Sequence, residues 1–247
     1  PWLPVRRTDG SRAWVAPTAL ADPTLVAFDA DRPDFNGALA QFAIGLLQTT
    51  APVETNTEWR ELFRRPPGAD VLAQWFAPVR SAFYLDGDGP RFMQDRTLHP
   101  LRSKSDKGDD VGGYEGVQQL LIDCAGEGEK IKNNTDHFIK RKDASFAICP
   151  ACATAALYTL QSSAPAGGRG YLVSARGGGP LSTLVQAGEQ FSLWHKLWLN
   201  VIEQPSFLGH SGESEKTDLE FRFPWVKDSR ALQPAGIAAR QFEAEKG

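Results

Sequence analysis

The chain is organised around residues 145–170, which read SFAICPACATAALYTLQSSAPAGGRG. Two cysteines come directly before a short apolar segment, and a glycine-rich string comes directly after it. Cys149 stands where a helix N-cap is expected, and Pro150 takes the favoured first helical position. Ala153, Leu157 and Leu160 then recur at the spacing of one helical face. The stretch predicts a helix of about three turns that joins a thiol pair to a backbone able to approach a partner closely.

The rest of the chain predicts further helices and short strands. Strands and turns are expected within residues 1–28, and Asp31 is expected to cap the first long helix. Helices are predicted over residues 33–49, 57–64, 69–83, 114–123 and 190–202, a strand pair over 171–176 and 181–186, and long loops near 86–113, 125–145 and 203–219. Scattered helices with short, mostly antiparallel strands indicate an α+β fold. We therefore predict a single α+β domain over residues 1–247.

Composition limits the class of protein. The chain has 247 residues, 41% apolar and 23% charged, which is ordinary for a soluble globular protein. Its net charge of −3 is unlike that of a protein that binds nucleic acid alone, so any DNA contact should use a few local groups. Because no signal peptide or membrane-length apolar run is seen, and two of the three cysteines form Cys-x-x-Cys, we predict a cytoplasmic protein without a membrane partner. We also expect the chain to be part of a longer protein, since it begins without Met.

The thiol pair leaves three interpretations open. Cys149 and Cys152 have the spacing of two zinc ligands, but a structural site needs four. A pair at a helix N-terminus also suits a redox couple, because the helix end lowers thiol pKa values. The third interpretation is two small buried residues without a ligand. No other pattern of His, Ser or acidic residues forms a catalytic constellation, so we predict that the chain is not an enzyme.

Two further segments have both a plain and a functional interpretation. Gly167-Gly-Arg-Gly170 is neither a dinucleotide fingerprint nor a P-loop, and an isolated string of this kind is usually a surface turn. The basic and acidic residues around Asp136–Lys142 are almost equal in number, so the local net charge is close to zero, which is typical of a solvated loop. However, it places an aromatic ring beside three consecutive basic residues, the combination that stacks on bases and pairs with phosphates.

Several short motifs, taken in order, resemble the large subunit of the type I-E CRISPR Cascade complex (the CasA family). They are Pro1–Val5, Phe83–Asp86 leading to Arg91–Gln94, Asp136–Arg141, the stretch from Cys149 to Gly170, and Arg176–Val185. The match runs with gaps from residue 1 to about residue 230. The resemblance implies the N-terminal portion of that subunit, without the family's C-terminal helical bundle.

The resemblance implies a non-catalytic function in DNA recognition. The subunit would recognise the PAM, the short sequence that marks foreign DNA, in target double-stranded DNA. It would help to start R-loop formation and to recruit the helicase-nuclease effector. Its partners would be the target duplex, the 5′ end of the CRISPR guide RNA and the other Cascade subunits. Guide–target pairing then reads the sequence.

The resemblance also assigns site residues. Gly167, Gly168, Arg169 and Gly170 would lie in the minor groove beside the PAM, although Arg169 interrupts the family's glycine pattern. Phe138, Lys140 and Arg141 would contact the guide 5′ end and the PAM-side duplex. Cys149 and Cys152 would bind structural zinc, with the second ligand pair expected beyond Gly247. The alternatives are a thiol oxidoreductase that uses this cysteine pair, and a zinc-stabilised scaffold without a nucleic-acid role.

Overall fold

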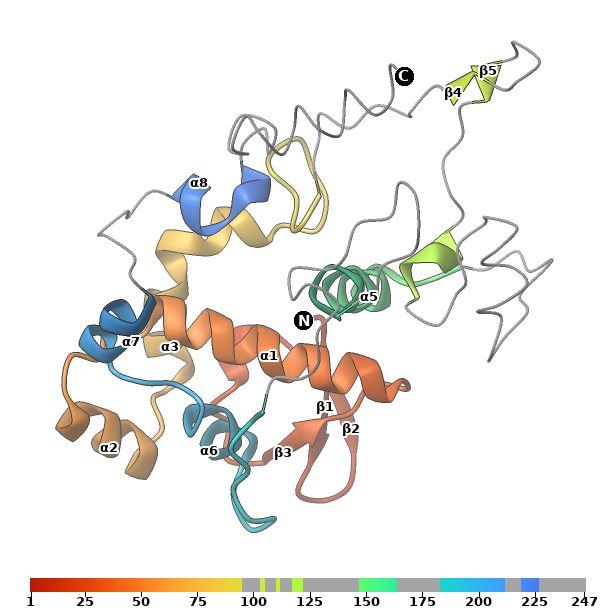
Figure 1. Ribbon diagram of the computed structural model, residues 1–247. Helices are drawn as coiled ribbons and strands as arrows, with labels where there is room; N and C mark the ends of the chain where they lie inside the picture. Colours follow the sequence, from red (N-terminus) through yellow and green to blue (C-terminus); the bar gives the residue numbers. More distant parts are fainter. Residues whose placement is uncertain are drawn as a thin grey trace. The chain divides into compact units, whose positions relative to one another are not determined.

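The computed structural model describes residues 1–94, 103–104, 110–111, 117–121, 147–163, 183–211 and 219–226. The chain forms two compact units, each described by itself. Unit 1 comprises Pro1–Pro78 and Val117–Ser214, and unit 2 comprises Val79–Gly116 and Glu215–Gly247. Helices combine with small antiparallel sheets, which confirms the predicted α+β class (Figure 1). The number of domains stays a prediction.

Unit 1 contains a three-stranded antiparallel sheet of order β2-β1-β3. Its strands are β1 (Leu3–Arg7), β2 (Arg12–Val15) and β3 (Leu25–Phe28). The β1–β2 hairpin turns at Gly10, whose φ of +83° suits glycine. Leu3 and Val5 are fully buried on β1, whereas Trp14 on β2 is half exposed. The sheet therefore packs one face on the core and leaves Trp14 outside it.

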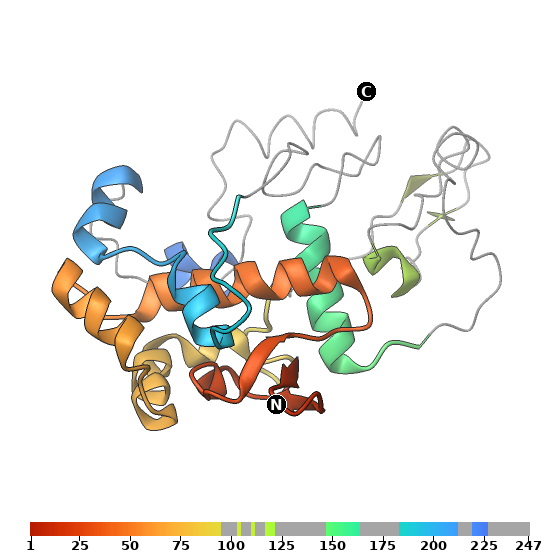
Figure 2. The same ribbon diagram turned by 90° about the horizontal axis from the view of Figure 1, so that it is seen from below.

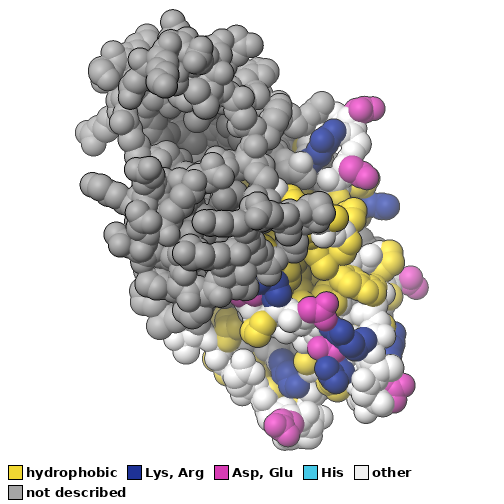
Figure 3. All heavy atoms as spheres, turned by 90° about the vertical axis from the view of Figure 1, so that its right-hand side faces the viewer, with side chains coloured by type: hydrophobic (Ala, Val, Ile, Leu, Met, Phe, Trp, Pro, Cys, Tyr) yellow, Lys and Arg dark blue, Asp and Glu magenta, His cyan; other side chains and the backbone are white. Residues whose placement is uncertain are grey.

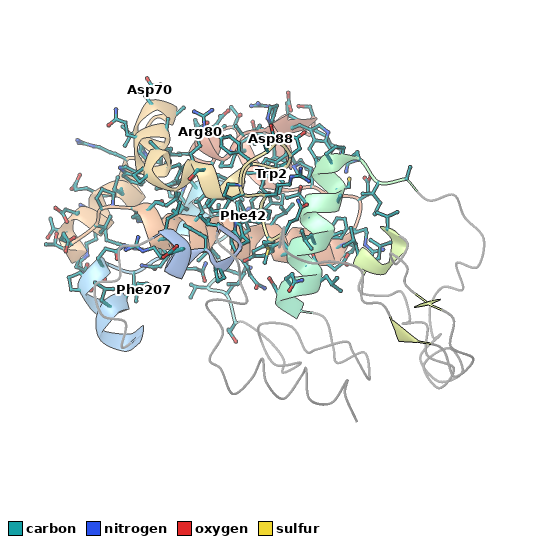
Figure 4. The ribbon with its side chains drawn as sticks, turned by 90° about the horizontal axis from the view of Figure 1, so that it is seen from above. Trp2, Phe42, Asp70, Arg80, Asp88 and Phe207 are labelled. Atoms are coloured by element: carbon teal, nitrogen blue, oxygen red, sulfur yellow. The ribbon has the colours of Figure 1, made fainter. Side chains whose placement is uncertain are left out.

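Helix α1 (Pro33–Thr50) is the central helix of this core and confirms the predicted helix over residues 33–49. Its buried face includes Phe42, whose ring meets that of Trp2 edge-on at 5.1 Å (Figure 4). The predicted cap is wrong: the N-cap residue is Arg32, and no side chain caps this end. Asp31 is not free to cap, because its carboxylate binds Arg12 at 2.7 Å.

Aromatic residues hold the next helices together. These helices are α2 (Asn56–Arg64), α3 (Ala69–Phe76), which continues as a 3-10 helix over Ala77–Phe83, and α6 (Leu193–Trp198). Trp194 and Trp198 on α6 are fully buried and stack at 4.8 Å. Their indole N–H groups donate to the carbonyls of Leu62 at 2.9 Å and Trp59 at 3.0 Å. Helix α6 is therefore fixed to α2 by stacking and by hydrogen bonds.

The remaining elements of unit 1 include the helix predicted from the thiol stretch. This is α5 (Pro150–Ser163), which packs across α1 (Figure 2). Of the helix predicted over residues 114–123, the structure describes residues 117–121, and a 3-10 helix covers Val117–Leu120 there. Helix α7 (Gln204–Ser211) replaces part of the loop expected near 203–219. The Gln204 N–H donates to Val53 O at 2.7 Å, a distant contact that the local sequence does not reveal.

Unit 2 gathers four aromatic rings. Phe83 lies 5.1 Å from Phe223 and 5.5 Å from Phe92, and the Trp225 indole donates to Ala82 O at 2.7 Å. Besides residues 79–83 of the 3-10 helix that follows α3, the described elements of this unit are β4 (Ser103–Lys104), β5 (Asp110–Val111), α8 (Leu219–Arg222) and a 3-10 helix over Pro224–Val226. Among the helices of the described residues, none is long and apolar enough to cross a membrane.

Candidate functional site

The thiol pair forms the N-terminus of α5, as the sequence predicts. The Ala153 N–H donates to Cys149 O at 2.8 Å, which closes the first turn. The Cys152 N–H donates to the Cys149 sulfur at 3.3 Å, so this side chain takes the place of a cap. Both cysteines are free thiols; Cys149 is exposed and Cys152 is half-buried. The local chain therefore turns both sulfurs toward the same end of the helix.

The two thiols have different acidities. The backbone N–H of Cys152 lowers the pKa of Cys149, because a donated hydrogen bond favours the thiolate. Burial raises the pKa of Cys152 to about 11, and its contact with Cys149 and the charge of Asp31 act in the same direction. Cys149 is therefore the thiol that ionises first.

A pocket of about 300 Å³ adjoins the thiols within unit 1. Its walls come from the sheet, the start of α1 and the start of α5, and most of its lining is apolar. Arg12, Asp29, Asp31 and Arg32 supply its charged groups. The pocket therefore brings together residues that lie more than a hundred positions apart in the sequence.

The charged groups of the pocket neutralise one another. The Asp29 carboxylate lies 2.9 Å from Arg6 and 3.0 Å from Arg12, and Arg12 also reaches Asp31 at 2.7 Å. The buried Asp29 Oδ2 atom has these guanidinium groups at ion-pair distance without hydrogen-bond alignment. On the face shown in Figure 3, both basic and acidic side chains of the described residues are present and are mixed with each other. This pocket is not an electropositive site for phosphate.

The cysteines meet half of the requirement for structural zinc. Two thiols at the start of one helix have the spacing and the sulfur chemistry that zinc prefers. Within the described ranges, no group of three or more His, Cys, Asp or Glu side chains gathers. A complete tetrahedral site would need two further ligands from outside those ranges.

The other predicted site residues lie outside the described residues. Phe138, Lys140 and Arg141 fall within residues 122–146, and Gly167, Gly168, Arg169 and Gly170 within residues 164–182. These two segments adjoin opposite ends of the thiol helix. Because α5 has 14 residues, its own two ends lie about 21 Å apart at a rise of about 1.5 Å per residue.

Sequence analysis missed three carboxamide side chains that each bind both backbone groups of one other residue, which lies 6, 15 or 154 positions away in the chain. Asn36 accepts from the Ala30 N–H at 2.8 Å and donates to its carbonyl at 3.3 Å. Gln48 does the same with Ile202, at 2.9 Å for both bonds. Asn200 accepts from the Val185 N–H at 2.6 Å and donates to Val185 O at 3.0 Å. Each carboxamide thereby forms hydrogen bonds with one backbone N–H and one backbone C=O, as the backbone of a neighbouring β-strand would.

Comparison with known proteins identifies the family. The family described as CRISPR-associated protein Cse1 matches residues 1–242. The chain belongs to the Cse1 family. This family match confirms the predicted resemblance to the large subunit of the type I-E Cascade complex.

Solved Cse1 structures share this fold. The chain matches Cse1 from Acidimicrobium ferrooxidans at 22% identity with a TM-score of 0.58, covering 83% of this chain and 38% of that one. The match to Thermobifida fusca Cse1 has 21% identity and a TM-score of 0.59, covering 82% and 38%. A CRISPR-associated protein from Thermus thermophilus matches at 18% identity and a TM-score of 0.54, covering 80% and 37%. The chain thus spans about 38% of the length of the first two Cse1 proteins.

Proposed function

We propose that this chain belongs to a non-catalytic Cascade subunit that recognises the PAM in target double-stranded DNA. The observation that carries the proposal is the match to the Cse1 family over residues 1–242. The subunit starts R-loop formation there and helps to recruit the helicase-nuclease. It acts in the cytoplasm with the guide RNA and the other Cascade subunits.

Two segments are proposed to make the contacts. Gly167, Gly168 and Gly170 bring bare backbone to the minor groove beside the PAM, and Arg169 is attracted by the negative potential of a narrow groove. Phe138 stacks on a base, while Lys140 and Arg141 pair with phosphates of the guide 5′ end or the duplex. Both segments adjoin α5, whose packing on α1 supports the proposal by giving them a common rigid attachment.

Binding of duplexes by the assembled guide complex tests this function. The complex is compared with and without the full-length subunit, on a duplex with a cognate PAM and on one with a scrambled PAM, at stated salt. We expect the subunit to tighten binding only to the PAM-bearing duplex. Equal binding of both duplexes, with or without the subunit, would refute the proposal.

Variants then test the individual contacts. Log affinity falls as log salt rises, and Lys140→Ala should make this fall less steep by about 1 unit of slope, which corresponds to the loss of one phosphate contact. Phe138→Ala should cost about 1–3 kcal/mol of binding if its ring stacks on one base. Arg65→Ala is the control for lost charge, since Arg65 is exposed just beyond the end of α2. An unchanged slope for Lys140→Ala, or an equal change for Arg65→Ala, would remove Lys140 from the contact.

We also propose that Cys149 and Cys152 bind structural zinc in the full-length subunit. Bound zinc would cross-link the start of α5 to the segment that carries the other two ligands. Metal analysis of the full-length protein should give stoichiometric zinc, lost in Cys149→Ser and Cys152→Ser and retained in Cys124→Ser. A metal-free wild-type protein would contradict this site.

A thiol oxidoreductase is a second candidate, and one observation favours it. The exposed Cys149 sulfur stands at a helix N-terminus, with the half-buried Cys152 directly behind it. Attack on a disulfide by Cys149, followed by resolution by Cys152, fits this order of exposure. Metal-free protein with thiol–disulfide exchange that is lost in Cys149→Ser would support it. Bound zinc without any effect of the subunit on duplex binding would instead indicate a scaffold.

A further inference from the structure

The pocket beside the thiols has a buried floor and an exposed apolar rim. Phe35 and Ala155 belong to the floor and are only 5% and 3% exposed. At the rim, the Trp14 side chain is 50% exposed, and Cys149 is exposed as well. Single exposed apolar residues are ordinary, but a half-exposed ring that borders an apolar cavity extends it into a continuous patch, and such patches mark binding sites.

Three elements position this lining. Pro4 on β1 and Trp14 on β2 are paired in the antiparallel register, so their side chains lie on the same face of the sheet. Phe35 lies in the first turn of α1, and Ala151 and Ala155 lie one turn apart on α5. Because both of these α5 residues are alanines, the helix fills little of the space between itself and the sheet.

The cavity has room for side chains of another polypeptide segment. Its volume is about 300 Å³. An apolar cavity of about 150 Å³ accommodates one benzene molecule. The pocket can therefore hold about two side chains of that size.

The charged residues of the lining already have partners. Arg12 lies 3.0 Å from the Asp29 carboxylate and 2.7 Å from that of Asp31. Arg32 lies 2.9 Å from Asp34. A phosphate would have to compete with these carboxylates, so the pocket favours a polypeptide over a nucleic acid. An apolar centre with a polar rim that contains Trp and Arg is typical of contacts between polypeptides.

Two observations favour the subunit's own remaining chain as this polypeptide. The chain spans about 38% of the length of the two Cse1 proteins compared above. Cys149 and Cys152 line the same pocket, and the third cysteine of the sequence is Cys124. A second pair of zinc-binding cysteines would therefore come from outside this chain and would hold its segment beside the pocket. A segment of the same subunit also reaches the pocket at a high effective concentration.

We infer that this pocket is the docking site for an apolar segment of the same subunit that lies beyond residue 247. Side chains of that segment fill the cavity, and Trp14 packs against them at the rim. The contact joins this N-terminal portion to the rest of the subunit. The inference rests on the proposal that the chain is part of a full-length Cse1 subunit, and it goes beyond the proposed function because the contact involves no DNA.

Photo-cross-linking of the isolated full-length subunit tests this contact. The photoreactive residue p-benzoyl-phenylalanine replaces Trp14, and mass spectrometry identifies the peptides that it captures on irradiation. We expect the main product to be a cross-link within one subunit, to a peptide beyond residue 247. Tyr84 in unit 2 offers a matched position, because it is aromatic and 49% exposed. The same probe at Tyr84 should not capture that peptide.

Oxidation of the unsubstituted subunit by hydroxyl radicals gives a second measurement, which decides if the substituted subunit does not fold. The oxidation rate of Trp14 is compared between the folded full-length subunit and the same protein unfolded in urea. A docked segment should slow this oxidation about tenfold or more, because residues at the centre of such contacts are fully desolvated. An uncovered ring should react at about half the unfolded rate, in keeping with its 50% exposure.

Several results would overturn the inference. Capture of a peptide from residues 122–146 would show that a segment of this chain fills the pocket. A product that joins two copies of the subunit, or that forms only after other Cascade subunits are added, would assign the pocket to a different partner. Equal capture of one peptide from both probe positions would remove its specificity. Oxidation of Trp14 at about half the unfolded rate would show that nothing covers the pocket.

Duplex binding, measured separately, keeps this inference apart from the proposed function. If the complex discriminates between the duplexes but the expected cross-link is absent, the docking site is refuted and the proposed function stands. If the cross-link forms but the complex does not discriminate, the proposed function is refuted and the docking site stands.

Discussion

Replacement of Trp198 by alanine should cost this chain about 4 kcal/mol of folding free energy. The indole is fully buried, stacks on Trp194 at 4.8 Å and donates to Trp59 O at 3.0 Å. A buried Trp removes about 150–250 Å² from water, which corresponds to ~4–6 kcal/mol at ~25 cal/mol per Å². The hydrogen bond adds ~1 kcal/mol. Relaxation around the cavity recovers part of this sum, which brings the value into the ~3–5 kcal/mol range of such substitutions.

Urea unfolding followed by far-UV circular dichroism measures this loss without relying on the removed fluorophore. Trp14→Ala is the matched control, because Trp14 is 50% exposed on the outer side of the sheet. We expect this control to change the free energy of unfolding by no more than about 0.5 kcal/mol. A loss below ~1 kcal/mol for Trp198→Ala, which is the size of the hydrogen bond alone, would refute the argument. Similar losses at both positions would refute it as well.

Two further predictions concern stability. Thr55→Ala should lower the free energy of unfolding by about 1 kcal/mol, because the Thr55 hydroxyl and the Glu58 carboxylate form a capping box at the start of α2. Urea unfolding measures this loss, and an equal loss in Thr57→Ala would contradict a capping effect. His195 should make stability depend on pH, since burial lowers its pKa below the ordinary value of 6.5 despite an opposing hydrogen bond to the Phe63 backbone. The unfolded chain binds the proton more readily, so this contribution is present above pH 6.5 and is lost as the pH falls toward the folded pKa. The unfolding free energy of wild type minus that of His195→Gln should shrink between pH 7.5 and 5.5, and a constant difference would contradict this assignment.

Local chemistry made several elements predictable from the sequence. The helices α1, α2 and α5 have apolar residues at helical spacing, and proline begins both α1 and α5. Cys149 was predicted at the N-cap because the following proline suits only the first turn of a helix. The α+β class and the family were also predicted correctly, because both predictions depend on short stretches of sequence and on their order along the chain.

Contacts between distant residues were not predictable from the sequence. Asp31 has the sequence signal of a helix cap, but its partner is Arg12 on strand β2. The helix predicted over residues 190–202 covers only Leu193–Trp198, because Ser192 becomes its N-cap and the chain then turns at Asn200. Gln48 and Ile202 are 154 positions apart, and a lone glutamine gives no sign of such a partner. The pocket beside the thiols was missed for the same reason.

The carboxamides that hold Ala30, Ile202 and Val185 are uncharged, as are the backbone groups that they bind. Dissolved salt screens charges over about 10 Å at 0.1 M, but it acts only weakly on neutral hydrogen bonds. Contacts with phosphate behave in the opposite way and weaken steeply as salt rises. Ionic strength should therefore change the proposed contacts with DNA, while the carboxamide bonds to Ala30, Ile202 and Val185 stay as they are. In a salt titration of duplex binding, these neutral hydrogen bonds add no salt dependence of their own to that of the proposed phosphate contacts.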